Sequence, residues 1–195
     1  MKKLLGILVL GLFLITPSQA DDIRDFQIEG MSVGDSLLNY MTKTEINDLK
    51  EPFTAGSIIS HEFYYVRIKD NSKFETYDFV GVNFKPDNKK FYVHSIIGDI
   101  SFNTIEDCYK KQNEILKELS NIFKNIAKKV GGDIRKYKGD KSGKSTIKSY
   151  TFYLYDGGGA HIGCYNFSQE LDGGQYLSVE LGSEEYAEFQ NRIYD

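Results

Sequence analysis

Six short runs of aromatic and β-branched residues constrain the fold more than any other feature of this chain. They are six to eight residues long, and polar or glycine-containing segments separate them. The runs are Phe63–Ile68, Tyr77–Phe84, Phe91–Ile97, Tyr150–Tyr155, Ala160–Tyr165 and Tyr176–Leu181. This composition predicts β-strands, and the short connections within each group of three predict antiparallel pairing.

A long amphipathic segment separates the first three runs from the last three. Asn103 or Thr104 is placed to cap a helix there, and Gly131–Gly132 is placed to end it. The apolar residues between these points fall on one stripe, as expected for a helix that packs against a core. The stripe consists of Cys108, Ile115, Leu119, Ile122, Phe123, Ile126 and Val130. The sequence therefore predicts one long helix, followed by an exposed basic loop over residues 133–146.

Shorter helices are predicted near both ends of the chain. Ser32 has the position and residue type of a helix cap. Thr42 and Glu45 form a capping-box pattern for a second helix, which ends before Pro52. Ser183 is placed to cap a last helix.

Together these patterns predict the fold class α+β. An antiparallel sheet of about six strands, which could also form two three-stranded meanders, packs against a long central helix and short terminal helices. No Pro- or Gly-rich linker divides residues 21–195. We therefore expect one domain over this range.

Residues 1–20 have the organisation of a secretory signal peptide. Lys2 and Lys3 precede an apolar run from Leu4 to Ile15, and small and polar residues lead to Ala20. As a helix the apolar run would span roughly 18 Å, too short for the roughly 30 Å of bilayer hydrocarbon. Asp21 rather than cysteine follows the predicted cut, so a lipoprotein anchor is excluded. The prediction is an exported protein, periplasmic or extracellular, with no membrane span after processing.

The two cysteines of the chain are predicted to form a disulfide. Cys108 falls in the first turns of the predicted long helix, and Cys164 falls in a predicted strand. Disulfides persist in exported proteins, and this bond would connect the helix to the sheet. The alternative is two buried thiols that do not meet. No C-x-x-C spacing supports a reactive pair.

Composition and charge argue against several kinds of partner. The formal net charge is −4, and removing the two lysines of the leader makes it −6. Nucleic-acid binding depends on clustered Lys and Arg, so we expect no nucleic-acid partner. His61, His94 and His161 have none of the spacings typical of metal ligands. We therefore predict no metal and no cofactor.

The string Gly34–Leu37 spells the GDSL motif of SGNH-type esterases, in which Ser36 would be the nucleophile. A serine nucleophile needs an imidazole base, which in that family comes from a late Asp-x-x-His. No histidine here has an aspartate three residues before it; Asp156 precedes His161 by five. We interpret the string as a chance match.

Residues 139–145 resemble a phosphate-binding loop. Their glycines have the wrong spacing for a Walker A motif, and the segment precedes a predicted strand instead of a helix. We interpret the segment as a solvated basic loop.

Three stretches carry a resemblance to known proteins. They are Asp25–Leu38, the residues from Cys108 to Gln112, and Ser142–Ser145 ahead of the Cys164 strand. Together they resemble a family of small exported bacterial proteins of unknown function, which implies no activity. Residues 29–32 are also similar to the helix start of SmpA/OmlA-like envelope domains. That resemblance implies a binding role in outer-membrane assembly.

The leading hypothesis from sequence is a non-enzymatic exported domain that binds an unknown envelope protein or a small ligand. No catalytic residues are assigned. The alternative is a secreted hydrolase whose catalytic residues come together only in the fold. The abundant strand tyrosines are interpreted as packed, half-buried side chains, with an aromatic ligand platform as the alternative.

Overall fold

The computed structural model describes residues 22–55, 58–68, 74–87, 89–155, 157–171 and 173–194. The predicted signal peptide, residues 1–20, lies outside the described residues. No helix within the described part of the chain is both long and apolar enough to cross a bilayer.

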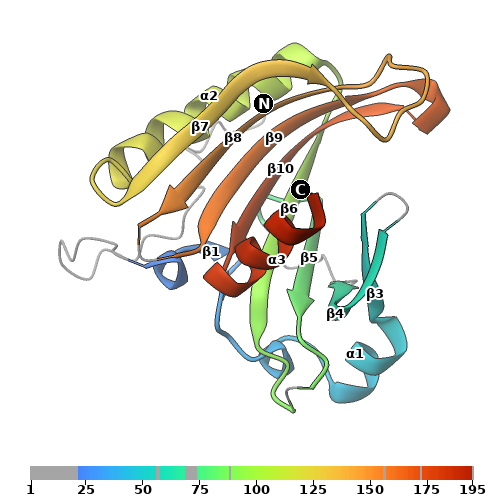
Figure 1. Ribbon diagram of the computed structural model, residues 1–195, viewed down its shortest axis with the longest axis vertical. Helices are drawn as coiled ribbons and strands as arrows, with labels where there is room; N and C mark the ends of the chain where they lie inside the picture. Colours follow the sequence, from blue (N-terminus) through green and yellow to red (C-terminus); the bar gives the residue numbers. More distant parts are fainter. Residues whose placement is uncertain are drawn as a thin grey trace, which may run out of the picture.

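The described residues are mostly β-structure, built around one eight-stranded antiparallel sheet (Figure 1). Its strand order is β3-β4-β5-β6-β10-β9-β8-β7. Two four-stranded meanders, β3 to β6 and β7 to β10, join through the antiparallel pair β6–β10. The strands are β3 (Glu51–Ala55), β4 (Ile58–Arg67), β5 (Phe79–Phe84), β6 (Val93–Phe102), β7 (Ala127–Lys136), β8 (Thr146–Leu154), β9 (Gly159–Phe167) and β10 (Gly174–Gly182).

The predicted fold class was wrong in its strand count and in its central helix. All six predicted strands are present, but β3 and β7, the two edges of the sheet, were missed. Strand β3 is only five residues long and contains Pro52. Strand β7 is exposed on both faces, so it lacks the apolar alternation by which internal strands are recognised. In β7 only Ala127 and Gly132 are even partly buried.

The predicted long helix is shorter than expected and lies to one side of the sheet. Helix α2 (Ile105–Ile122) is capped by Thr104, whose hydroxyl accepts the Asp107 N–H. It ends at Phe123, and the chain then enters β7 at Ala127. Val130, assigned to the helix stripe from sequence, lies in β7. Helix α2 packs mainly against β9 and β10, covering one half of one face.

The first predicted helix is replaced by a small hairpin. Strands β1 (Gln27–Ile28) and β2 (Met31–Ser32) pair antiparallel across a turn in which Glu29 and Gly30 have φ of 51° and 78°. A single 3₁₀ turn, η2 (Leu37–Asn39), follows. Ser32 therefore lies in a strand and does not cap a helix. Another 3₁₀ turn, η1 (Ile23–Asp25), precedes the hairpin, and a third, η3 (Gln169–Leu171), follows β9.

The second predicted helix is confirmed. Helix α1 (Lys43–Leu49) begins with a reciprocal capping box, in which Thr42 and Glu45 each bind the backbone N–H of the other. It ends ahead of Pro52, as expected for a residue that lacks a backbone donor.

The last helix, α3 (Glu184–Tyr194), packs on the sheet face opposite α2. Leu177, Val179 and Leu181 of β10 belong to the main core beneath α2. The intervening Glu180 contacts α3, because alternate strand residues point to opposite faces. The sheet is strongly bent, with α3 inside the bend and α2 outside it (Figure 1). A separate aromatic cluster holds α3 to β3 and β4: Phe53, Phe63, Tyr186 and Phe189.

The predicted disulfide is present. Cys108 at the start of α2 is bonded to Cys164 in β9, with Cα atoms 6.0 Å apart and a sequence separation of 56. Both residues are fully buried. Closing a loop of this length stabilises the fold by about 4 kcal/mol in the chain-entropy model. The bond connects the helix to the centre of its half of the sheet.

We predict that the Cys108→Ser/Cys164→Ser variant has a melting temperature lower by roughly ten degrees, since about 4 kcal/mol corresponds to that shift in a domain of this size. Differential scanning calorimetry measures the change. Thiol titration of the denatured, unreduced wild-type protein is the control and should find no free thiol. Two free thiols would show that packing alone holds α2.

Candidate binding site on the uncovered sheet face

Ser36 is not arranged as a nucleophile. Its hydroxyl donates a 2.7 Å hydrogen bond to the Lys90 carbonyl, and its backbone pairs with Tyr92 in an isolated bridge. Within the described residues, the side chain makes no hydrogen bond to a histidine. Ser36 therefore serves to fix the segment before η2 against the end of the β5–β6 connection.

His94 lies beside both a serine and a carboxylate, but with the wrong geometry for a catalytic triad. Its Nδ1 is 3.2 Å from Ser183 Oγ and 3.4 Å from Glu185 Oε2. In a triad the serine and the acid engage opposite ring nitrogens. Ser183 Oγ is also used as the cap of α3, where it accepts the Tyr186 N–H. This cluster therefore anchors the start of α3 to β6.

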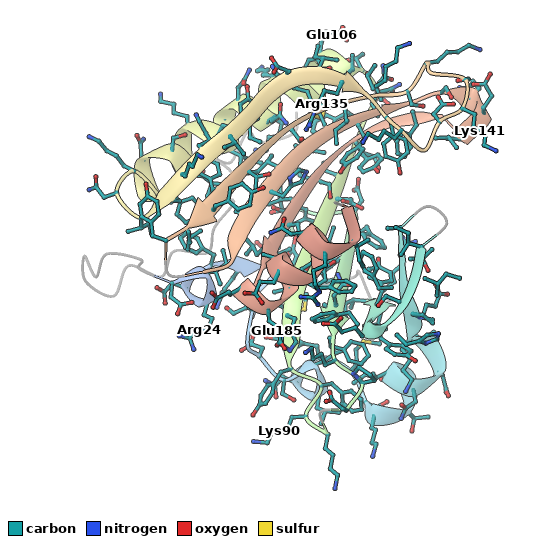
Figure 2. The ribbon with its side chains drawn as sticks, viewed as in Figure 1. Arg24, Lys90, Glu106, Arg135, Lys141 and Glu185 are labelled. Carbon is teal, nitrogen blue, oxygen red and sulfur yellow. A yellow bond between two sulfur atoms is a disulfide. The ribbon has the colours of Figure 1, made fainter. Side chains whose placement is uncertain are left out.

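An open groove of about 880 Å³ lies next to His94. Arg24 and Glu185, labelled in Figure 2, line it together with Lys85. Glu185 forms an ion pair with Lys85, and Lys85 lowers the pKa of that carboxyl. Burial lowers the pKa of His94. The groove thus contains paired charges and a neutral imidazole, without an activated serine.

The other two histidines also contact hydroxyl groups. His61 Nδ1 is 3.1 Å from Tyr64 Oη, and His161 Nδ1 is 3.0 Å from Thr151 Oγ1. Burial lowers the pKa of His161 to about 4, so this imidazole is neutral at physiological pH. No three His, Cys, Asp or Glu side chains in the described ranges come together as a metal-binding group.

The loop between β7 and β8 is organised around a buried carboxylate. Asp140 is 6% exposed and accepts hydrogen bonds from the hydroxyls of Ser142, Ser145 and Ser168. These bonds hold its pKa well below the usual range. The backbone N–H groups of Ser142 and Ser145 also point at Asp140. They are therefore not available to cradle a phosphate group.

The uncovered part of the sheet lies on the same face as α3. Strand register places two rows of side chains across it. The first row is Phe79, Asp99, Ser178, Gly163 and Ser149, from β5 to β8. The second is Ser101, Tyr176, Tyr165, Ile147 and Arg135, from β6 to β7. The first row is therefore mostly small and polar, whereas the second has two adjacent tyrosines.

Two pairs of aromatic rings lie on this face, one within the second row and one at the β5 end of the first row. Tyr165 and Tyr176 are stacked with ring centroids 4.8 Å apart and an interplanar angle of 6°. On the other side, Tyr65 and Phe79 lie nearly parallel at 6.4 Å. All four side chains are partly exposed. Partly exposed rings of this kind offer apolar faces and edges on which a planar group can pack.

Glycine is needed on this face where rings lie flat against the sheet. A Cβ on Gly81 would be 2.4 Å from Tyr65 Oη, and one on Gly163 would be 2.8 Å from a ring carbon of Tyr165. Both distances are shorter than van der Waals contact. The glycines thus allow Tyr65 and Tyr165 to cover the backbone.

Asp99 lies in the first row between Phe79 and Ser178. Its Oδ1 is buried and has no hydrogen-bond partner among the described residues. Burial raises the pKa of Asp99 to about 6, although the Ser178 hydroxyl and the positive charge of Arg67 act in the opposite direction. Arg67 does not form an ion pair with Asp99; its guanidinium lies 4.3 Å from the Phe79 ring centroid. An acceptor atom is therefore left unused between two aromatic groups.

Glu180 provides a contrast on the same face. Its carboxylate accepts a 2.6 Å hydrogen bond from Ser95 and further bonds from Tyr186 and Gln190 of α3. Burial nevertheless raises its pKa. Glu180 is thus fully used in docking α3, whereas Asp99 is not.

Sequence analysis did not single out Asp99 or its neighbours. The available signal was a charged residue inside an apolar strand, since Ile96, Ile97 and Ile100 surround it in β6. The aromatic residues around it were predicted to be packed, half-buried strand tyrosines, and their burial agrees with that prediction. The registers of β6 with β5 and with β10 bring them together around one carboxylate.

Comparisons with known proteins found neither a matching family model nor a matching curated protein. The function is therefore argued from the sequence and the geometry of this chain.

We predict that Asp99→Asn makes the protein more stable at pH 8 by about 1 to 3 kcal/mol. The native pKa of Asp99 lies above the ordinary value of 3.8, so the native state binds the proton more tightly. Native stability accordingly falls as the pH rises from about 4 to 6, and asparagine removes this loss. Urea unfolding of both proteins at pH 4 and pH 8 measures the difference in their free energies of unfolding.

The control for this experiment is Asp133→Asn, which changes an exposed carboxylate in β7. We expect it to leave the free energy of unfolding unchanged at both pH values. An Asp99→Asn protein that is less stable than wild type at pH 8 would show that the carboxylate has a stabilising partner.

Proposed function

We propose that the protein is a non-enzymatic binding protein, exported from the cytoplasm, whose small ligand docks on the uncovered face of the sheet. The ligand has a planar ring, which lies against the aromatic side chains, and a hydrogen-bond donor, which reaches Asp99. The observation that carries the proposal is the buried Oδ1 of Asp99 without a partner. A buried carboxylate oxygen without a hydrogen-bond partner lowers the stability of the native state. Groups that cost stability in this way recur at functional sites.

The surrounding chemistry supports the ligand class. Phe79, Tyr65 and Tyr176 supply ring faces and edges, and aromatic pairs contribute about 0.5 to 1.5 kcal/mol beyond burial. When Asp99 is ionised, its carboxylate can only accept hydrogen bonds, so it selects a donor group on the ligand.

Export is part of the proposal and rests on two observations. The leader pattern of residues 1–20 indicates secretion, and the Cys108–Cys164 disulfide is typical of proteins that fold outside the cytoplasm.

Benzamidine is a suitable probe because it combines a planar ring with a donor group that fits a carboxylate. We expect it to shift the backbone amide NMR signals of β5, β6 and β10 around Phe79, Asp99 and Ser178. Benzoate has the same size and the opposite charge, and we expect no shifts at these strands. Asp99→Asn should weaken benzamidine binding at least tenfold, about 1.4 kcal/mol.

Asp133→Asn serves again as the matched control and should bind benzamidine as the wild-type protein does. Shifts that cluster at His94 and Ser183 would move the site to the open groove. Equal shifts with benzamidine and benzoate, or none with either, would contradict the proposal.

A further inference from the structure

Positive charge is concentrated in one segment of the chain. Residues 110–148 contain 12 of the 24 Lys and Arg residues but only 4 of the 28 Asp and Glu residues. This segment has a net charge of +8, within a chain whose net charge is −4. It comprises most of α2, all of β7, the loop that follows and the start of β8. In the fold α2 and β7 run along the same side of the molecule (Figure 1).

Strand β7 is an open edge of the sheet. Among the strands of the described residues it is the last in the order, and its one partner there is β8. An edge strand presents outward N–H and C=O groups that can pair with another chain. At ten residues, β7 is twice as long as β3, the other edge. Strand β3 also contains Pro52, which has no backbone donor. Of the two edges, β7 is the one suited to accept a strand.

The four cations of β7 are either exposed or hydrogen-bonded to a serine hydroxyl. Lys129 Nζ is 3.4 Å from Ser120 Oγ, and Arg135 Nη2 is 3.2 Å from Ser149 Oγ. Lys128 and Lys136 are exposed. No carboxylate in the described ranges forms an ion pair with any of these four side chains. Figure 2 shows Arg135 on β7 and Lys141 in the loop that follows it.

We propose that β7 accepts an acidic, extended segment of a partner protein as a ninth strand of the sheet. Backbone pairing along the open edge provides the docking geometry, and the unpaired cations of β7 select a partner that carries Asp or Glu. A second copy does not fit, because pairing β7 with another β7 would place lysines against lysines.

The two glycines of β7 limit where the partner can pair. Gly131 and Gly132 have φ of 108° and 114°, and the register with β8 jumps from Gly131 to Ile134. Such a bulge, like edge lysines, discourages indiscriminate pairing. The regular stretch from Ala127 to Gly131, which carries Lys128 and Lys129, remains open to an acidic strand.

Fluorescence anisotropy with synthetic peptides tests this proposal. The probe is a labelled, end-capped ten-residue peptide of alternating valine and glutamate. We expect saturable binding that weakens as salt is raised. A valine–lysine peptide should not bind. The valine–glutamate peptide with N-methyl groups along one edge has the same charge but cannot pair, and it should bind at least tenfold more weakly.

Matched charge reversals locate the site. Lys128→Glu/Lys129→Glu in β7 should weaken peptide binding at least tenfold. Lys110→Glu/Lys117→Glu changes the charge equally on the exposed side of α2, and we expect at most a threefold loss. Far-UV circular dichroism checks that both variants keep the native fold.

Several results would overturn the proposal. One is equal binding of the methylated and unmethylated peptides. Another is an equal loss of peptide affinity in the two charge-reversal variants. Either result would indicate diffuse electrostatic attraction. Absence of peptide binding is a third. If phosphatidylglycerol vesicles bind the wild-type protein and bind both charge-reversal variants equally weakly, the basic surface is assigned to anionic lipid. These outcomes are independent of the benzamidine experiment.

Discussion

The antiparallel pairing of β6 with β10 is the interaction on which the rest of the structure depends. Without it the chain would form two separate four-stranded meanders, each with two edges. The pair spans eight residues on each strand, from Ser95 to Phe102 and from Gln175 to Gly182. It places Asp99 opposite Ser178, and it brings β5 and β9 to either side with their aromatic residues. A slip of one residue would turn every side chain of one meander to the other face.

The two faces of this sheet have different roles. The face beneath α2 is closed by apolar side chains and by the disulfide, and it holds the main core. The opposite face is only partly covered by α3, which uses Glu180 and the cluster around Phe63. The uncovered remainder carries rings and a carboxylate that the fold itself does not use. The main core and the proposed binding surface therefore lie on opposite sides of one layer.

Sequence patterns were sufficient for the internal strands and for the disulfide, but insufficient for the edges. Internal strands have at least one buried face, which leaves a visible apolar pattern in runs such as Tyr176–Leu181. Strand β7 has no apolar pattern of this kind. Ile126 and Val130 happen to stand at the spacing that continues the stripe of the preceding helix. Asp99 could not be recognised as a site residue, because its neighbours come from strands up to eighty residues away in the chain.

The disulfide has one further consequence. Residues 108–164 form a closed covalent ring that contains most of α2, all of β7 and β8, and the whole of the basic segment. A protease that cuts the exposed β7–β8 loop, for example at Lys138, leaves the two pieces joined through Cys108 and Cys164. A nicked molecule therefore loses neither piece until the bond is reduced.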